Sequence, residues 1–323
     1  MDNDLLSAQD VADILKIARN TVYELIKRGE LNSSKVGKQV RVTRQEVSAY
    51  LKRTANADAV NEKMTLSAPA AGRNIGKPIY TQVFEENIHG NEFIICGQDI
   101  ALDILANHLN TALEGLQVYR SSLGSYNGIY ALYQGRVHVA TSHLWDGDLD
   151  DYNVSYVKKM MPGIPACTMR IGKRWQGFYV QKGNPKGISG WKDLKRPDLS
   201  IVNREKGSGT RVLLDEKLRL MGVIGEYIEG YYHECKSHLA VASIVSHGDA
   251  DLGIGCETGG KNINGIDFIP LQQECYDLIV RMSDVERQPY RTILEIVSSP
   301  MFRRDLESIG GYDCQETGKI IWG

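Results

Sequence analysis

A helical segment, a glycine, two further residues and a short apolar strand follow one another in this order twice in the chain. The first copy is NGIYALYQGRVHVATSH at residues 127–143, and the second is LAVASIVSHGDADLGIG at residues 239–255. A helix that leads through a short turn into an apolar strand is typical of α/β units. The repetition therefore predicts two similar α/β lobes joined by crossing strands.

Strand-like and helical segments alternate from residue 79 onward, which favours an α/β fold with mainly parallel sheets. The strand-like segments are short and apolar: EFIICG, LQVYRSSLG, VHVATSH, GFYVQKG, LSIVNRE, ADLGIG and YDLIVRMS. The chain has 323 residues, which suits two or three folded units, the largest with ample material for a core.

The first 53 residues follow another pattern of two short helices, a hairpin and a third helix. Ser7 is an N-cap with Asp10 three residues on, NTVYELIKRGEL supplies the second helix, and Thr43 with Glu46 forms a capping box before the third. Between them, KVGKQVRV alternates like a small hairpin. From about residue 5 to 53 this order resembles the excisionase and MerR-like winged-helix family, in which such a domain binds DNA.

Charge separates this part from the rest of the chain. Residues 1–56 carry ten Lys and Arg against seven Asp and Glu, a net charge of +3, and the remainder carries 28 against 33, a net charge of −5. Only the N-terminal part is therefore a candidate for nucleic-acid binding. The candidates for base and phosphate contacts are Arg19, Asn20, Thr21, Tyr23, Lys27, Arg28, Lys35, Lys38 and Arg41. For any single one of them, an ordinary solvated basic face is an equal alternative.

Residues 55–78 lose the apolar periodicity and are rich in Ala, Asn, Gly and Pro, as linkers are. We therefore expect a winged helix-turn-helix domain at residues 1–54, a linker at 55–78 and a two-lobed α/β domain at 79–323.

The larger part resembles the type II periplasmic-binding-protein fold. More narrowly, it resembles the cytoplasmic PBP-like domain found attached to helix-turn-helix domains and to molybdopterin-biosynthesis proteins. The resemblance rests on SLGSYNGIYAL, GRVHVATSHLWD, NREKGSGTRVLLDE, SHLAVASIVSHGDADLGIG and SSPMFRRDLESIGGYDCQETG, all within residues 90–318. It implies a ligand held between two lobes, at the carboxyl ends of strands and the N-termini of the following helices.

The stretch KGSGTR, between an apolar strand and a helix, has the chemistry of an anion-binding turn. Its glycines allow close backbone approach, its hydroxyls are donors and the arginines balance charge: Arg204, Gly207, Ser208, Gly209, Thr210 and Arg211. The stretch is neither a Walker A loop nor a G-x-G-x-x-G motif, because Thr210-Arg211 follows the second glycine. A capped turn needed only for folding is the alternative.

Further candidates for the cleft stand at the ends of strands or the starts of helices: Gln98, Asp99, Ser122, Ser125, Asn127, His143 and His238. Asp99 is equally suited to be an N-cap, and its carboxylate would repel an anion unless it orients a donor. Capping is the alternative for the serines, and a packed side chain is the alternative for each histidine. Tyr126, Trp145 and Tyr152 are candidates for the pocket wall, although a place in the core is their more ordinary role.

A ligand domain joined to a DNA-binding domain predicts a one-component transcription regulator, in which ligand-induced closure changes DNA binding. The resemblance implies molybdate or tungstate as the effector, and no cofactor or resident metal is expected. A small organic acid or a phosphorylated metabolite stays open as the effector. Because winged domains usually act as dimers on two half-sites of double-stranded DNA, we also expect a homo-oligomer.

Other classes of protein are less well supported by the sequence. An enzyme is not expected, because there is no nucleophile elbow or catalytic-triad order. An excisionase-like architectural DNA-binding protein is the alternative, although it has no need of a two-lobed ligand domain. No secretory signal or membrane-spanning run is present, so we expect a cytoplasmic protein without membrane contact. The six cysteines are scattered and indicate neither a zinc site nor a disulfide framework.

Overall fold

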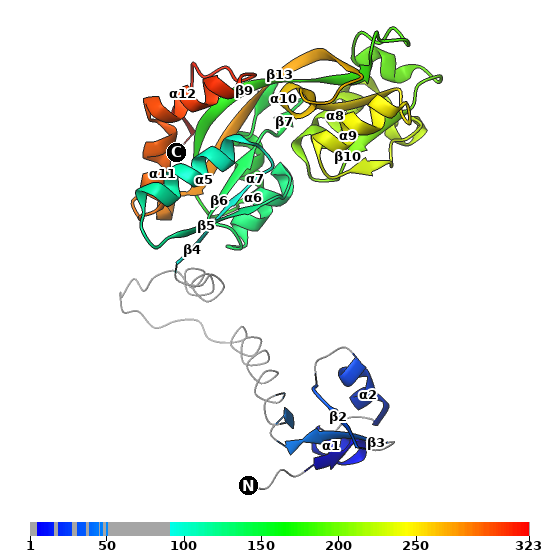
Figure 1. Cartoon of the computed structure of the whole chain (residues 1–323), viewed down its shortest axis with the longest axis vertical. Helices are drawn as coiled ribbons and strands as arrows, with labels where there is room; N and C mark the ends of the chain where they lie inside the picture. The colour runs from blue at the N-terminus through cyan, green and yellow to red at the C-terminus, as the bar shows by residue number, and fades with distance from the viewer. Residues whose placement is uncertain are drawn as a thin grey trace, which may run out of the picture. The chain divides into compact units, whose positions relative to one another are not determined.

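The computed structural model describes residues 5–15, 19–27, 31–36, 39–44, 46–47, 50 and 91–322. The chain divides into two compact units, Met1–Gly76 and Lys77–Gly323, each with a hydrophobic core of its own (Figure 1). The expected linker at residues 55–78 lies outside the described residues.

The first unit combines helices with a small antiparallel sheet of order β1-β3-β2. Its elements are β1 (Leu5–Ser7), α1 (Ala8–Leu15), α2 (Arg19–Lys27), β2 (Ser34–Val36) and β3 (Gln39–Thr43). The two expected helices and the β2–β3 hairpin are confirmed. Strand β1 was not expected, because its three residues are too few to show a period, and it forms by pairing with β3.

Both expected caps of this unit are present. Ser7 N–H donates to Asp10 Oδ2 at 2.8 Å, and Asp10 N–H donates to Ser7 Oγ at 3.3 Å. Glu46 N–H donates to Thr43 Oγ1 at 3.2 Å, at the start of helical residues after β3. Apolar side chains from the helices and the sheet then form one small core, which includes Val11, Val22, Leu25, Leu31 and Val42.

Two lobes make up the second unit. The first lobe holds β4 (Glu92–Cys96), α5 (Ala101–Ala112), β5 (Gln117–Ser121), α6 (Ser125–Tyr133), β6 (Val139–Ser142), α7 (Val154–Met160), α11 (Tyr290–Val297) and α12 (Pro300–Ile309). The second lobe holds β10 (Ile201–Arg204), α8 (Gly209–Met221), β11 (Glu234–Cys235), α9 (His238–His247), β12 (Leu252–Cys256) and α10 (Glu257–Gly260). Short elements complete the unit: β7 (Trp145–Asp146), β8 (Asp151–Tyr152), η1 (Trp191–Lys195), η2 (Gly225–Tyr227), η3 (Met282–Asp284) and β14 (Ile320–Trp322).

The two lobes have the same strand arrangement, which confirms the predicted duplication. In the first lobe β4 is parallel to both β5 and β6, and β6 is antiparallel to the crossing strand β13 (Ile266–Arg281). In the second lobe β10 is parallel to both β11 and β12, and β12 is antiparallel to the crossing strand β9 (Ala166–Gln181). The repeated glycines, Gly135 and Gly248, both have positive φ values, of 69° and 82°. They end α6 and α9, and their left-handed conformation lets the backbone turn into β6 and β12.

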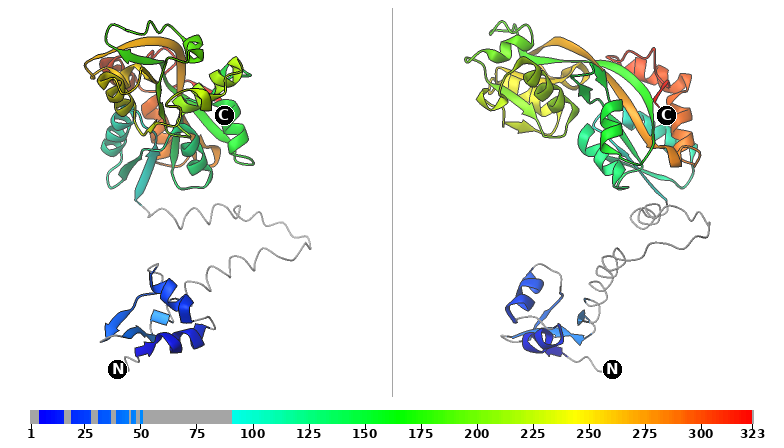
Figure 2. Two further views of the ribbon diagram at one scale, coloured as in Figure 1. Left: turned by 90° about the vertical axis from the view of Figure 1, so that its right-hand side faces the viewer. Right: turned by 180° about the vertical axis from the view of Figure 1, so that it is seen from behind.

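Strands β9 and β13 run side by side from one lobe to the other (Figures 1 and 2). Each has 16 residues, so the short strands expected at GFYVQKG and YDLIVRMS are only the ends of much longer ones. The polar residues that precede both segments concealed this length, because a local apolar run is what marks a strand in the sequence. Antiparallel pairing of β9 and β13 joins all strands of the unit except β7 and β8 into one nine-stranded mixed sheet, rather than a mainly parallel one.

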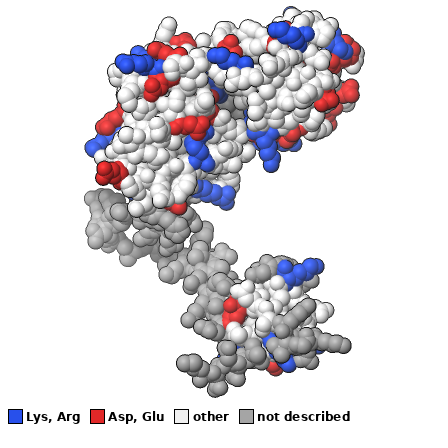
Figure 3. Space-filling model, viewed as in Figure 1, with Lys and Arg blue, Asp and Glu red and all other residues white. Residues whose placement is uncertain are grey.

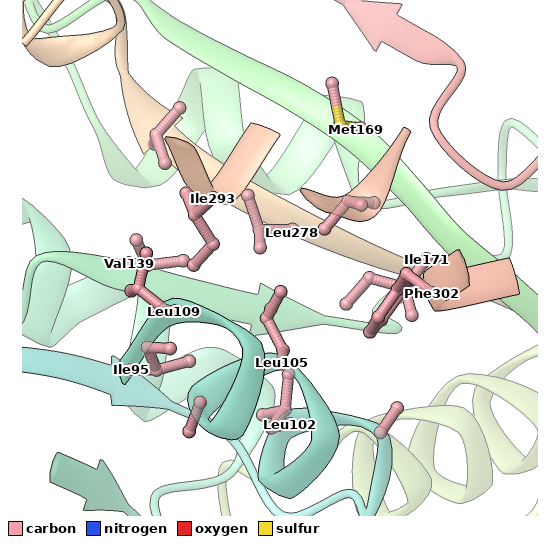
Figure 4. Close-up of a cluster of buried hydrophobic side chains, with 14 of the residues drawn as sticks. Ile95, Leu102, Leu105, Leu109, Val139, Met169, Ile171, Leu278, Ile293 and Phe302 are labelled. Atoms are coloured by element: carbon pink, nitrogen blue, oxygen red, sulfur yellow. The ribbon is translucent and has the colours of Figure 1, made fainter. Parts of the chain in front are cut away.

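The largest core lies in the first lobe, between the sheet and helices α5, α11 and α12. Leu102, Leu105 and Leu109 recur at helical spacing on one face of α5 and are fully buried. Figure 4 shows them beside Leu278 of β13 and Phe302 of α12. Burying each such side chain contributes roughly 1.5–3 kcal/mol to the stability of the folded state. This packing fixes α5 against the sheet. Among the described residues, no helix combines the length and apolar character of a membrane span.

Candidate functional site

Four helices in residues 91–322 begin at one polar cavity. Gly97, Gln98 and Asp99 precede α5, Gly124 and Ser125 stand at the start of α6, Ser208 and Gly209 at the start of α8, and His238 at the start of α9. The rest of the lining is Leu123, Thr141, His143, Arg174, Arg204 and Tyr276. Because α5 and α6 belong to one lobe and α8 and α9 to the other, the cavity lies between the lobes. Its volume is about 20 Å³, close to the space of a single water molecule.

The helix starts make the cavity a favourable place for negative charge. The first N–H groups of a helix have no intrahelical acceptor, and the helix dipole is positive at that end. In α8, Ser208 Oγ accepts the N–H of Arg211 at 3.2 Å. The N–H groups of Gly209 and Thr210 lie between these two residues, in the first turn of the helix. Residue 209 must be glycine, since a Cβ there would lie 2.5 Å from the His143 ring. A small anion is therefore the ligand class that these termini favour.

Arg204 links the two lobes at the edge of the cavity. Its side chain is 1% exposed, and its guanidinium donates to both carboxylate oxygens of Glu205, at 2.8 and 2.9 Å. It also donates to Gln98 Oε1 in the first lobe, and Gln98 Nε2 donates to Glu205 Oε1 at 3.1 Å. Glu205 thus orients the guanidinium of Arg204 and offsets part of its positive charge.

Beneath the cavity, Arg174 is held by two carboxylates. It donates to Glu274 and to Asp99, and its guanidinium lies 4.4 Å from the centre of the Tyr276 ring. His143 Nδ1 lies 2.6 Å from Glu274 Oε2. Burial alone would raise the pKa of Glu274, but Arg174 and His143 lower it to about 2. Glu274 is therefore a permanent anion that fixes these two cavity side chains.

Asp99 has its carboxylate fully engaged. One oxygen accepts the N–H of Ala101 at 2.8 Å and the hydroxyl of Tyr312 at 2.6 Å, and the other accepts from Arg174. Asp99 is thus both a cap for the start of α5 and the group that orients Arg174. The sequence had suggested either a helix cap or a carboxylate that orients a donor, and Asp99 does both.

His238 is neutral in this environment. Burial and the nearby charges of Arg204 and Arg174 hold its pKa well below the ordinary value. Its Nδ1 accepts the N–H of Cys256 at 3.4 Å, so the ring proton is on Nε2. His238 is therefore a neutral N–H donor at the cavity.

The lobes are in contact around the cavity, so the structure is closed. Tyr126 N–H of the first lobe donates to the carbonyl of Gly207 in the second at 2.9 Å, and Asn127 Nδ2 donates to the carbonyl of Lys206 at 3.3 Å. At Gly124, an added Cβ would lie 2.6 Å from the Cα of Ser208. The starts of α6 and α8 thus meet with no room for another carbon atom.

The cavity brings together eight of the thirteen sequence candidates: Gln98, Asp99, Ser125, His143, Arg204, Ser208, Gly209 and His238. The other five lie nearby but outside its lining: Ser122, Asn127, Gly207, Thr210 and Arg211. Ser122 accepts from Gln98 through its carbonyl, Asn127 bridges the lobes, and Thr210 donates to buried Gln176. Arg211 pairs with Asp215 and Glu234 and stacks on Tyr231, so in this structure its charge is balanced by protein carboxylates.

Of the aromatic candidates, Trp145 and Tyr152 are buried together in a small core cluster, and Tyr126 is exposed. None of the three lines this cavity.

Arg174, Glu274, Thr141 and Tyr276 at this site lie outside the candidates that the sequence provides. Arg174 and Glu274 are directly paired across β9 and β13, and both lie just before the apolar runs that marked these strands. A usable signal was present, because Arg170, Arg174 and Gln176 occupy alternate positions in RIGKRWQG, as on one face of a strand.

In the first unit, five of the predicted DNA contacts lie exposed on α2: Arg19, Asn20, Thr21, Tyr23 and Lys27. The Arg19 guanidinium lies 5.8 Å from the centre of the Tyr23 ring. Arg41 is partly buried on β3, and Lys35 belongs to β2. Arg28 and Lys38 lie outside the described residues.

Fold and site together define a two-lobed ligand-binding domain with a polar cavity between its lobes, in a chain that also carries a helix-turn-helix domain. The chain belongs to the family with the PBP superfamily domain, which matches residues 106–298, and a helix-turn-helix domain matches residues 5–55. These are a substrate-binding and a DNA-binding kind of domain, neither of them enzymatic. Their combination indicates a DNA-binding regulator that binds a ligand.

Two relatives by sequence match this chain over most of their own length. The chain is 40% identical over 314 residues to the uncharacterized protein YvgK of Bacillus subtilis (strain 168), covering 97% of this chain and 96% of YvgK. It is also 48% identical over 110 residues to an uncharacterized protein from the 5′ region of a 2Fe-2S ferredoxin gene of Clostridium pasteurianum, which covers 34% of this chain and 97% of that protein.

Two solved structures share the fold at low sequence identity. A Clostridium perfringens protein with bound phosphate has a TM-score of 0.51 at 14% identity, covering 69% of this chain and 99% of its own. EhuB in complex with hydroxyectoine has a TM-score of 0.50 at 14% identity, covering 72% of this chain and 92% of its own.

Proposed function

We propose that this protein is a one-component transcription regulator whose two-lobed domain captures a small oxyanion, with molybdate or tungstate as the first candidates. The observation that carries the proposal is the meeting of four helix N-termini, Arg204 and the neutral His238 at one small cavity. Such a set of donors stabilises negative charge that is spread over several oxygens.

The size of the cavity favours an inorganic anion over a larger organic effector. About 20 Å³ between the closed lobes is close to the space of one water molecule, so any effector must part the lobes, and a compact ion parts them least. A phosphorylated metabolite carries an organic group in addition to its phosphate. The lining side chains leave no room for this group in the closed state. The small size of the closed cavity therefore favours a compact tetrahedral ion over a larger effector.

Among oxyanions, the donor set favours one without a proton. Asp99 and Glu274 are both engaged by Arg174, so the groups left for a ligand are mainly donors. Molybdate and tungstate accept at every oxygen, whereas phosphate near neutral pH keeps a proton that needs an acceptor. Phosphate is the first competitor, because the Clostridium perfringens protein with this fold contains it.

Ligand capture would act on the equilibrium between open and closed lobes. A ligand that contacts both lobes stabilises the closed form by its higher affinity for that form. Acting in the cytoplasm as a homodimer on two half-sites, the regulator would convert this shift into a change in DNA binding.

Calorimetric titration of the full-length protein tests the proposal. Molybdate, tungstate, sulfate, phosphate and acetate are titrated separately. Saturable binding that is tightest for molybdate or tungstate is the expected result. Binding of phosphate alone would replace the ion and keep the oxyanion class, whereas no saturable binding of any oxyanion would refute the proposed ligand class.

A matched pair of variants tests whether the cavity is the binding site. Ser208 and Ser237 both cap a helix, since their hydroxyls accept the N–H of Arg211 and Ala240, but only Ser208 lines the cavity. Ser208→Ala and Ser237→Ala should each lower the free energy of unfolding by about 1 kcal/mol. Only Ser208→Ala should weaken oxyanion binding, by about tenfold. Equal affinities in the two variants would place the ligand elsewhere.

A further inference from the structure

A second cavity, an open depression of the surface, lies on the other face of the crossing strands and is larger than the first. Its volume is about 470 Å³, which is in the range of sites for small organic molecules. Its lining comes from the β7–β8 hairpin, η1, α8 and the crossing strands: Trp145, Asp150, Asp151, Tyr152, Lys173, Trp191, Lys217, Leu271, Gln272, Gln273 and Cys275.

The two cavities use opposite faces of the same strand pair. Arg174 and Glu274 are direct partners across β9 and β13 and support the first cavity. The adjacent cross-strand pair, Lys173 and Cys275, lines the second. Because successive side chains of a strand point to opposite faces, the second cavity is a separate site and not an extension of the first.

Aromatic rings and one lysine give the second cavity its chemistry. Lys217 Nζ lies 3.7 Å from the centre of the Trp145 ring and 5.8 Å from that of Trp191. Lys217 has no ion pair within the described part of the chain, and burial lowers its pKa. Asp150 raises this pKa in part but forms no ion pair with Lys217, so the ammonium can still accept a closer anionic partner.

The other charged groups of the lining are already occupied or lie at the edge. Lys173 pairs with Glu316 at 2.8 Å. Asp150 accepts the indole N–H of Trp145 at 3.1 Å, and Asp151 is exposed. Lys217 is therefore the lining cation without an ion pair among the described residues. Trp145 is buried beneath it, and the half-buried indole of Trp191 is the flat surface against which a ring can stack.

We propose that this second cavity binds a small aromatic carboxylate, whose ring packs against the half-buried Trp191 and whose carboxylate pairs with Lys217. The site does not depend on the identity of the ion in the first cavity. It is placed to affect that cavity, because α8 begins there with Ser208 and carries Lys217 further along. Trp145 also follows His143, which lines the first cavity, by two residues. Any effect of one ligand on the affinity for the other would be reciprocal.

Titrations of the full-length protein with benzoate and indole-3-acetate test this site, followed by tryptophan fluorescence and by calorimetry. Acetate and benzamide are the comparison ligands, because the first lacks the ring and the second lacks the charge. We expect saturable binding of at least one aromatic carboxylate and binding weaker by about tenfold or more for both comparison ligands.

Variants locate the binding. Lys217→Met keeps the length of the side chain and removes its charge, so it should weaken binding of the aromatic carboxylate by about tenfold or more, and Lys217→Arg should retain it. Lys192→Met is the matched control, because Lys192 is an exposed lysine of η1 outside the cavity. Circular dichroism checks that every variant is folded.

Three results would overturn the proposal. The first is the absence of saturable binding for both aromatic carboxylates. The second is equal binding to Lys217→Met and Lys192→Met. The third is a preference for an organic cation such as choline, which would make the rings a cation site and leave Lys217 without the role assigned to it.

Discussion

At the scale of single residues, the site depends on charged side chains that hold one another in place. Arg174 is 75 residues from Asp99 and 100 residues from Glu274 in the chain, yet it donates to both. Removing one partner of such a buried set leaves an uncompensated charge and is strongly destabilising. These residues are therefore poor choices for testing ligand contact, and Ser208 is a better one because its loss costs little folding energy.

A half-buried histidine of the first lobe, His138, makes stability depend on pH. His138 stacks on Phe93 and accepts the N–H of Ile94 at 2.8 Å. Burial, with help from Arg281, lowers its pKa to about 4, whereas an unfolded histidine titrates near about 6.5. As the pH falls, the unfolded chain binds this proton first, so the stabilising contribution is present above about pH 6.5 and is lost toward pH 4. We expect a loss that approaches about 1.4 kcal/mol per pH unit within this window.

Urea unfolding at several pH values measures this effect. The wild-type chain is compared with His138→Asn, which keeps an acceptor but cannot titrate, and with His233→Asn at an exposed position. The His138 variant should show the shallower decline of unfolding free energy with falling pH. The same slope in all three proteins would mean that His138 does not carry the effect.

At the scale of elements, the site is made by the starts of helices and not by any one motif. Helices α5 and α8 follow the central strands β4 and β10 of the two lobes, and α6 and α9 lead into β6 and β12. The duplicated arrangement therefore brings two helix N-termini from each lobe to the same place. KGSGTR supplies only one of these four termini, which is why it was a partial description of the site.

Gly124 should control how closely α6 approaches α8. Its φ of −67° suits any residue, but an added Cβ would meet backbone atoms of Gly207 and Ser208 at 2.6 to 2.8 Å. Gly124→Ala should therefore keep each lobe folded while hindering closure. Since relieving such a contact costs about 1–3 kcal/mol, we expect oxyanion affinity to fall by about 5-fold to 150-fold.

Hydrogen exchange gives a second measure of closure that does not need the ligand. The amide of Tyr126 is bonded across the lobes to Gly207, so it should exchange faster in Gly124→Ala than in the wild-type chain. Gly190→Ala is the control, because nothing lies within 4 Å of its added Cβ. Unchanged exchange at Tyr126 in the Gly124 variant would argue against the tight contact.

At the scale of the whole molecule, the two units differ in the sign of their net charge. The N-terminal 56 residues are net basic and the rest is net acidic. Over the visible face of the second unit, Lys and Arg are interspersed with Asp and Glu and form no continuous basic surface (Figure 3). Attraction to the phosphate backbone is thus expected of the first unit, and the ligand cavity belongs wholly to the second.

Arg19→Ala should therefore affect DNA binding and leave ligand binding unchanged. Arg19 is exposed on α2 beside Tyr23. If it contacts one phosphate, its loss should weaken binding to duplex DNA and reduce the slope of log affinity against log salt by about 1. Fluorescence anisotropy at several salt concentrations measures the slope, using a labelled duplex from upstream of the protein's own gene.

The matched control for this prediction is Arg196→Ala, because Arg196 is a surface arginine of the second unit that pairs with Asp198 at 2.9 Å. It should keep the wild-type slope. Calorimetry with molybdate should give the same affinity for the wild-type chain and for Arg19→Ala. Equal salt slopes for both variants would show that Arg19 makes no phosphate contact.

The local patterns of the sequence determined the kinds of element, their order and the duplicated plan. Apolar periodicity, capping residues and turn glycines act within a few residues of one another, so α6, α8 and α9 and the winged domain were predictable. The same logic placed Ser208, Gly209 and His238 at helix starts, where anions bind. Only the tertiary structure decided the length of β9 and β13, the pairing of Arg174 with Glu274 and the position of Arg211 outside the cavity. These depend on contacts between distant segments, whose free energy leaves no period in the local sequence.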